Sequence, residues 1–165
     1  MGKLIGGDAK AGKAIKKKFL KANQAIVQLR NAIKDCLIAE EYRGKIIKWR
    51  RKYIKGLDGR HLHVRSVHSA LNLLLQSAGA LVCKYWIVRT EERLLARGLK
   101  HGWDGDFALM AWCHDEQQIA CRTEEIADII IAEAQLAMRD TQKHFNFRVQ
   151  LDIDGIKGKN WYDCH

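Results

Sequence analysis

The stretch Phe107-Ala-Leu-Met-Ala-Trp-Cys-His-Asp-Glu-Gln-Gln-Ile-Ala-Cys121 contains two apolar runs separated by His114-Asp115-Glu116. A run of Phe, Leu, Met, Trp and Cys is typical of a buried strand, and Gln118 to Arg122 is long enough for a short partner. The pattern therefore predicts a β-hairpin with its charged residues at the turn. Hairpin turns usually contain Asn-Gly or Asp-Gly, which tolerate positive φ, but this turn has no glycine.

The neighbouring carboxylates of Asp115 and Glu116 suggest metal binding. Two adjacent carboxylates repel one another unless a cation lies beside them. Mg²⁺ suits such a turn because it takes one or two carboxylates and completes its shell with water and substrate phosphate. For the tripeptide in isolation, a solvated acidic turn is the simpler interpretation. Zinc is disfavoured because Cys113-His114 and Cys164-His165 lack the usual ligand spacing.

The composition indicates one globular domain. The chain has 165 residues, and its hydrophobic content of 47% is enough to build a core. Its five cysteines include no Cys-x-x-Cys motif, which is typical of a reduced, cytosolic protein. No apolar run of about 18 residues and no signal peptide are evident, so no membrane contact is expected.

The net charge of +10 is concentrated near the N-terminus. The first 60 residues hold 17 Lys and Arg against 5 Asp and Glu, whereas the remaining 105 hold 12 against 14. Clustered Lys and Arg are the electrostatic footprint of a phosphate backbone. A solvated basic face and a dock for an acidic protein tail remain open alternatives, because composition alone does not separate them.

The remaining periodicities predict an α+β fold. Helices are expected at 14–21, from the N-cap Asn23 to Ile38, from the cap Ser66 toward Gly98, and at 124–142. Strands are expected at 46–54, at 61–64 after a turn at 56–59, and at 147–153. Trp161 and Tyr162 in the tail are expected to pack back onto the rest of the fold.

Three neutral polar residues share one face of the long helix. His68, Asn72 and Gln76 fall at i, i+4 and i+8, so their side chains are stacked along the helix. Uncharged side chains that both donate and accept hydrogen bonds suit the minor groove, where the base pattern is degenerate. The simpler alternative is a mildly polar solvent face.

Several motifs together resemble one family. They are Lys55-Gly-Leu-Asp-Gly-Arg60, His63-Val-Arg-Ser66, Ala70-Leu-Asn72, Leu74-Leu-Gln-Ser-Ala-Gly-Ala80, Gly98-Leu-Lys-His-Gly-Trp-Asp-Gly-Asp-Phe107, Trp112-Cys-His-Asp-Glu116 and Cys164-His165. From about Gly7 to His165, the chain resembles the C-terminal part, the distal fingers and palm, of the family A (DNA polymerase I family) DNA polymerases of short-tailed lytic phages.

The resemblance implies a partial polymerase palm: a small antiparallel sheet with a catalytic hairpin packed against helices. Residues 1–45 would be the remaining, basic and helical part of the fingers, and residues 46–165 the C-terminal part of the palm. The implied partners are primer-template DNA and a deoxynucleoside triphosphate, in the cytosol of a bacterium or phage-infected cell. Lys48, Arg50, Arg51 and Lys52 would contact DNA phosphates, and the face of His68, Asn72 and Gln76 would lie beside the primer terminus.

The resemblance also implies a two-metal Mg²⁺ site. Asp115 would bridge both ions together with an Asp from another strand, Glu116 would be an auxiliary carboxylate, and His114 would lie near the terminal phosphate of the primer. The sequence departs from the family pattern at Gln117, where an apolar residue is usual. The bridging Asp of the first polymerase motif, the nucleotide-binding helix, the thumb and the proofreading exonuclease are not found in these 165 residues.

Three hypotheses follow from these departures. In the first, the chain is the C-terminal piece of a DNA polymerase, inactive alone, whose missing motifs lie on a second polypeptide. In the second, it is a noncatalytic DNA-binding or replisome-docking remnant of an interrupted polymerase gene. In the third and weakest, Asp115 and Glu116 serve an unrelated metal-dependent hydrolase. The joint presence of Asp115, Asn72 and Gln76 favours the first, because a docking protein has little chemical need for them.

Overall fold

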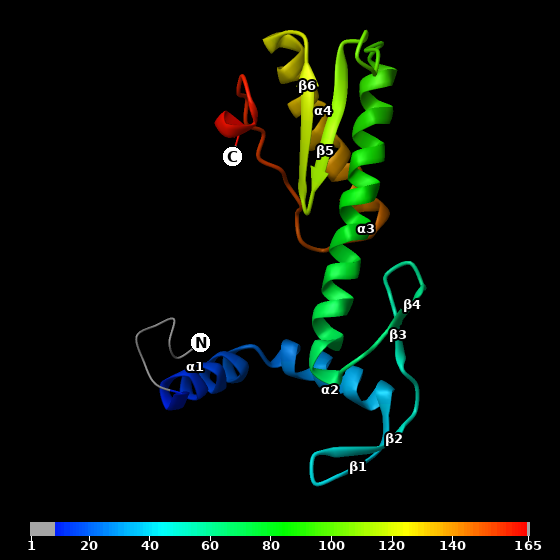
Figure 1. Ribbon diagram of the computed structural model, residues 1–165, viewed down its shortest axis with the longest axis vertical. Coiled ribbons are helices and arrows are strands. Elements are labelled where there is room, and N and C mark those ends of the chain that lie inside the picture. The colour runs from blue at the N-terminus through cyan, green and yellow to red at the C-terminus, as the bar shows by residue number, and fades with distance from the viewer. Residues whose placement is uncertain (1–8, 165) are drawn as a thin grey trace. The chain divides into compact units, whose positions relative to one another are not determined.

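The computed structural model describes residues 9–164, and these form four α-helices, three antiparallel strand pairs and a short 3-10 helix (Figure 1). This confirms the predicted α+β class. The chain divides into two compact units with the boundary between Gln76 and Ser77. The assignment of residues 1–45 to fingers and 46–165 to palm stays a prediction.

The first unit begins with two helices, α1 (Ala9–Ala22) and α2 (Gln24–Leu37). Both were predicted, although α1 starts earlier than expected. Asn23 does not cap α2 with its side chain. Its Nδ2 instead donates to the Phe19 carbonyl at 2.8 Å, so this side chain provides a hydrogen-bond donor for one of the last carbonyl groups of α1.

The single strand predicted at 46–54 is wrong, because it is divided between two hairpins. Strand β2 (Lys45–Trp49) pairs with β1 (Ile38–Tyr42), which sequence analysis missed. The two residues between these strands, Arg43 and Gly44, have φ values of 49° and 77°, as a tight two-residue turn requires. After β2 the chain bends, because the backbone N–H groups of Arg50 and Arg51 donate to the Leu37 carbonyl.

The second hairpin of the first unit pairs β3 (Tyr53–Lys55) with β4 (His61–His63), as predicted. Ile54 faces inward from β3 and joins the core of this unit. The core contains buried apolar residues from α2, β3, the segment after β4 and the beginning of α3, namely Ile33, Leu37, Ile54, Val64 and Ala70.

Helix α3 (Val67–Ala96) contributes its first ten residues to the first unit and the remainder to the second. Ser66 precedes it, and its Oγ accepts the His68 backbone N–H at 3.3 Å. Contrary to the sequence expectation, α3 is long and apolar enough, by length and composition, to cross a membrane. Core helices of water-soluble proteins pass the same test, so this property alone assigns no membrane role.

The second unit consists of the α3 remainder, the hairpin β5 (Phe107–Cys113) and β6 (Glu116–Cys121), and α4 (Glu124–His144) (Figure 1). Helix α4 begins where predicted, because the Thr123 side chain accepts the Ile126 N–H. Two apolar clusters join α3 to α4, one around Trp86 and one around Leu94. In the first, the Trp86 indole N–H donates to the Ala134 carbonyl at 2.9 Å.

The strand predicted at 147–153 is wrong, since this segment is irregular. Its backbone groups bind side chains of α4 in place of a neighbouring strand: the Leu151 N–H donates to Gln142, and Arg139 donates to the Leu151 carbonyl. Leu151 and Ile153 pack against the Trp86 cluster. The short helix η2 (Trp161–Cys164) follows, but Tyr162 is 88% exposed and does not pack back as expected.

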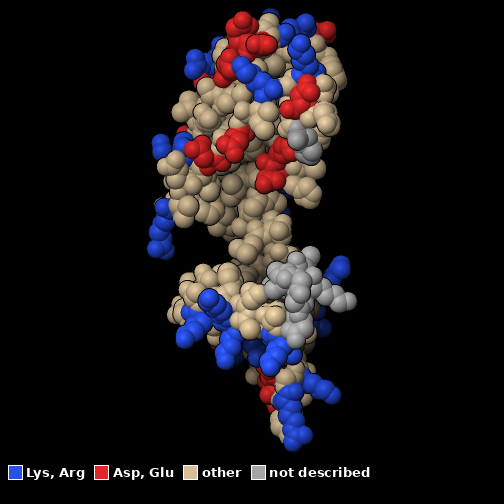
Figure 2. Space-filling model, turned by 90° about the vertical axis from the view of Figure 1, so that its left-hand side faces the viewer, with Lys and Arg blue, Asp and Glu red and all other residues tan. Residues whose placement is uncertain are grey.

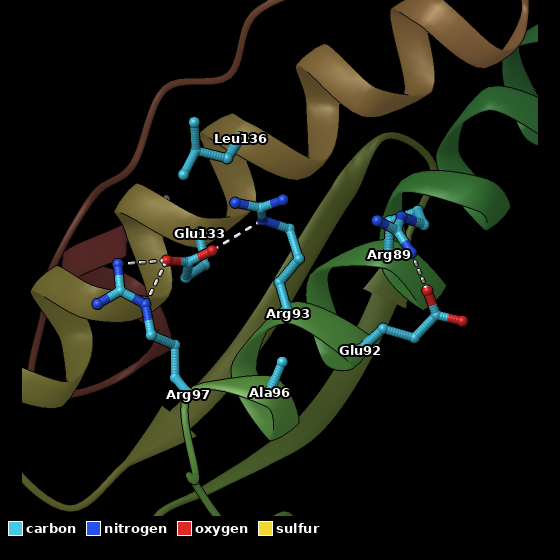
Figure 3. Close-up of a pocket in the computed structure, with 7 residues that line it drawn as sticks. All are labelled: Arg89, Glu92, Arg93, Ala96, Arg97, Glu133 and Leu136. Carbon is cyan, nitrogen blue, oxygen red and sulfur yellow. Dashed lines mark hydrogen bonds and ion pairs between the residues drawn. The ribbon is translucent and has the colours of Figure 1, made fainter.

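A ladder of arginines and carboxylates also joins α3 to α4 and lines a surface pocket (Figure 3). Glu133 is buried between Arg93 and Arg97, whose Nε atoms each lie 2.7 Å from a carboxylate oxygen. Asp140 accepts from Arg93 and from Arg89. Burial would raise the pKa of Glu133, but the hydrogen bonds from Arg97 and Arg93 outweigh it and hold that pKa below its ordinary value.

We expect Glu133→Gln to lower the free energy of unfolding at pH 7 by about 1–3 kcal/mol, because it removes charged hydrogen bonds. The low folded-state pKa stabilises the protein above the ordinary Glu pKa of about 4.3, and this contribution is lost as pH falls through the lower folded value. The difference between wild type and Glu133→Gln should therefore shrink in denaturant unfolding near pH 3.

Glu92→Gln is the matched control, because Glu92 is 52% exposed and its ion pair with Arg89 lies within α3. It should change the free energy of unfolding little at either pH. A gap between wild type and Glu133→Gln as wide at pH 3 as at pH 7 would contradict the ionic role of Glu133.

Candidate functional site

The turn of the β5–β6 hairpin carries the residues singled out by the sequence. Cys113 pairs with Glu116, so the turn itself consists of His114 and Asp115, and Glu116 is the first residue of β6. His114 takes the place that glycine often has, with a φ of 55°. Histidine is among the non-glycine residues found more often in this left-handed region, although the conformation still requires support from its surroundings.

Two contacts that sequence analysis missed support this turn. The Trp112 indole N–H donates to the His114 carbonyl at 2.8 Å, which closes the turn from the β5 side. The Lys84 ammonium of α3 lies 5.9 Å from the centre of the Trp112 ring, within the range of a cation–π contact. The only sequence signal for this arrangement was a tryptophan two residues before the turn.

Asp115 and Glu116 differ in their surroundings. Asp115 is exposed and lies near α3: burial raises the pKa of the Cys83 thiol, and the Asp115 charge raises it further. Glu116 is half-buried and accepts a hydrogen bond from the Gln118 side chain. The two carboxylates therefore offer different ligand capacity, with Asp115 the more accessible.

The donor set at this turn fits Mg²⁺ as a partial site. Mg²⁺ binds through one or two carboxylates and otherwise keeps water and phosphate ligands, so the exposed Asp115 oxygens suit it. Among residues 9–164, no group of three or more His, Cys, Asp or Glu side chains is arranged to hold a metal. The remaining ligands would have to come from outside this segment. His165, one half of the disfavoured zinc pair Cys164-His165, lies outside the described residues.

Gln117, the departure noted in the sequence, points into the interface between the hairpin and α3. It lines a small cavity with three other polar residues, Thr90, Glu91 and His101, and with several apolar ones. Its Nε2 is buried and has no hydrogen-bond partner within the described part of the chain. Gln117 pairs with Trp112 in the hairpin, so the presence of glutamine in place of the usual apolar residue leaves the strand pairing intact.

The other predicted residues lie in the first unit. His68, Asn72 and Gln76 lie on one helix, α3, as their spacing predicted, and the structure shows that all three are exposed. Lys48, Arg50 and Lys52 are exposed as well. In the view of Figure 2, Lys and Arg side chains gather over the first unit, whereas most Asp and Glu lie over the second.

Arg51 differs from its basic neighbours. Its Nε donates to the Cys36 carbonyl at 3.1 Å, at the end of α2, and its guanidinium lies 5.6 Å from the centre of the Tyr53 ring. The bond to Cys36 raises the pKa of Arg51 above its ordinary value. Arg51 therefore ties β3 to α2, in addition to any contact with a phosphate.

Comparison with known proteins identifies the relatives of this chain. Residues 1–163 match the model of the family described as DNA polymerase family A. The chain is 55% identical to the DNA-directed DNA polymerase of Enterobacteria phage T3 and 55% identical to that of Escherichia phage T7, over 168 aligned residues in each case. It is 26% identical to the DNA-directed DNA polymerase of Escherichia phage Phieco32. Each match covers 100% of this chain but only 24–25% of the relative, so the chain spans about a quarter of the length of these relatives.

Trp112→Phe keeps an aromatic ring for Lys84 but removes the N–H that binds the His114 carbonyl. We expect it to lower the free energy of unfolding by about 0.5–1.5 kcal/mol, the usual contribution of one hydrogen bond. Amide hydrogen exchange within Phe107–Cys121 should also accelerate, because the left-handed turn loses its support. Denaturant unfolding and exchange followed by mass spectrometry measure these two effects.

Trp103→Phe is the matched control, since Trp103 is 79% exposed. It should leave both measurements unchanged. If Trp112→Phe exchanged at the wild-type rate across the hairpin, the hydrogen bond would not be what holds the turn.

Proposed function

The chain belongs to DNA polymerase family A, and from this premise we propose that it supplies the C-terminal part, the distal fingers and palm, of a DNA-directed DNA polymerase. The observation that carries the proposal is the β5–β6 turn, where an exposed Asp115 follows a His114 held at positive φ. The Trp112 hydrogen bond to the His114 carbonyl supports this turn, so the backbone of Asp115 is held in place while its carboxylate oxygens remain accessible to a ligand.

The proposed reaction is transfer of a nucleotide from a deoxynucleoside triphosphate to the 3′-hydroxyl of a primer. When bound, Mg²⁺ neutralises charge on the reacting phosphates and stabilises the attacking and leaving oxygens. Asp115 would hold that ion with its exposed carboxylate. Glu116, already engaged by Gln118, would act as an auxiliary carboxylate, and His114 would lie near the terminal phosphate of the primer.

The exposed residues of the first unit would bind the primer-template. His68, Asn72 and Gln76 carry no fixed negative charge and form one accessible row on α3, which suits hydrogen bonds to minor-groove base edges. Lys48, Arg50 and Lys52 would contact phosphates, and binding should therefore weaken with rising salt. Arg51 would contribute mainly by holding β3 in place for them.

The missing parts of the site would come from a second polypeptide. Within these 165 residues there is no first-motif carboxylate to share an ion with Asp115 and no nucleotide-binding helix. Among residues 9–164, no third potential ligand joins the two carboxylates of the hairpin turn. We propose that this segment is inactive alone and completes its active site with that partner, in the bacterial or phage-infected cytosol.

Substitutions at the turn test the metal assignment in the assembled enzyme. Asp115→Asn should reduce Mg²⁺-dependent primer extension to about one thousandth of wild type or less, because it would remove the charged oxygens with which Asp115 would hold the ion. Glu116→Gln should leave a measurable fraction, since water can replace an auxiliary ligand. Asp104→Asn is the control: it removes an exposed carboxylate of the same unit, away from the turn, and should extend primers normally.

Equal extension by wild type and Asp115→Asn would refute the metal role of this carboxylate. Such a result would favour the alternative function, a noncatalytic DNA-binding or replisome-docking protein. The exposed basic residues could still bind DNA, whereas Asp115 would make no contribution to primer extension.

A further inference from the structure

We propose that the outward face of the β3–β4 hairpin is a stacking platform for a base of single-stranded nucleic acid, with the His61 ring as its contact surface. The proposal rests on the proposed function. It adds that the basic first unit binds single-stranded nucleic acid, and it identifies the side chains that contact the base.

Strand register places four side chains on this face. Tyr53 pairs with His63, and Lys55 pairs with His61, whereas Ile54 and Leu62 between them pair on the opposite face. Ile54 is buried, and Leu62 packs against the same core. Because side chains alternate across a strand, Tyr53, Lys55, His61 and His63 must all point away from the core. A short hairpin thus presents two imidazoles, a phenol and an ammonium group outward.

Two of these rings already form a stack. The Tyr53 and His61 rings lie 4.0 Å apart between centres, with an angle of 30° between their planes. The Arg51 guanidinium lies over Tyr53 and is itself fixed by its bond to the Cys36 carbonyl. Tyr53 is half-buried and His61 is exposed, so the Tyr53 end of the stack is supported and the His61 end is accessible. A base placed on His61 would extend a stack whose geometry is already set.

The surrounding charge favours a polyanion. Residues 45–65 contain eight Lys or Arg and one Asp. The single carboxylate, Asp58, is paired with Arg60. Lys55 lies opposite His61 on the same face, and Lys52 is exposed just before β3. Cations that hold a phosphate backbone beside aromatic rings are the combination that single-strand-binding proteins use.

The rings select single strands over the other polyanions that this surface could attract. In a duplex the bases are stacked on one another and offer no free face within the helix, whereas an unpaired base does. An acidic peptide would satisfy the cations, but it carries no flat ring for His61. Unpaired nucleic acid is therefore the ligand that this face fits, and preferential binding of an acidic peptide would contradict that assignment.

The test uses the full 165-residue chain with two single-stranded oligodeoxynucleotides of equal length and charge. One is oligothymidylate with a central 2-aminopurine, and the other has abasic sites in place of bases. We expect 2-aminopurine fluorescence to be quenched on binding, and the abasic strand to bind about fivefold more weakly or worse, as loss of one stacking contact predicts. The assay contains neither Mg²⁺ nor nucleotide, so its result is independent of any polymerase activity.

The variants separate stacking from charge. His61→Ala should bind the base-bearing strand as weakly as wild type binds the abasic one, while His61→Phe should restore binding because it retains a flat ring. Leu57→Ala is the matched control: it shortens a side chain that is 45% exposed in the turn of the same hairpin, outside the Tyr53–His61 stack, and should change binding less than twofold. Circular dichroism would show that each variant is folded.

Three results would overturn the proposal. The first is equal binding of the two strands by wild type. The second is an equal effect of His61→Ala on the binding of both strands. The third is binding of a glutamate decapeptide by wild type together with no quenching of the 2-aminopurine fluorescence. Failure of primer extension in the assembled enzyme would leave this inference untouched, and failure here would leave the metal role of Asp115 untouched.

Discussion

The insertion of Phe107 between α3 and α4 is the contact on which the second unit depends. Phe107 is the first residue of β5, it is 4% exposed, and it packs with Leu94 of α3 and Ile130 of α4. The His101 ring stacks on it at 5.0 Å. This anchor fixes the open end of the hairpin, so the position of the turn at its other end follows from the length and register of two paired strands.

The β5–β6 hairpin that carries the candidate site is therefore supported at both ends. At the open end the support is apolar burial, which does not depend on the ionisation of any side chain. At the turn it is the Trp112 hydrogen bond and the contact of Lys84 with the Trp112 ring. The arginine ladder around Glu133 holds α3 to α4 in the same unit. Together these contacts explain how an exposed carboxylate can occupy a defined position without a glycine in the turn.

Elements with long, regular patterns were predictable from the sequence, and elements decided by non-local contacts were not. The hairpin at 107–121, α3 and α4 follow from apolar periodicity over many residues. Strand β1 was missed because its residues Glu40 and Glu41 do not alternate with apolar ones and its pairing with β2 decides its conformation. The apolar and polar alternation at 147–153 matched a strand, but α4 satisfies that backbone through Gln142 and Arg139.

The same distinction between local pattern and non-local contact applies to the candidate site. The sequence placed His114 and Asp115 at a turn, because two apolar runs flank them, and the spacing of His68, Asn72 and Gln76 predicted one shared helix face. It did not show that Glu116 belongs to β6, that Arg51 is bound to the Cys36 carbonyl, or that Glu133 is buried between arginines. Each of these three features depends on a partner distant in sequence or on strand register. Neither can be predicted from composition or periodicity.

We propose above that this segment contributes one carboxylate to an active site that a second polypeptide completes. The most direct test of this proposal is primer extension by the chain alone, by a polypeptide carrying the remaining family A motifs alone, and by the two mixed, each with and without Mg²⁺. The account predicts extension only in the mixture with Mg²⁺ and a stable complex of the two polypeptides. Extension by the chain alone, or a stable complex that never extends a primer, would contradict it.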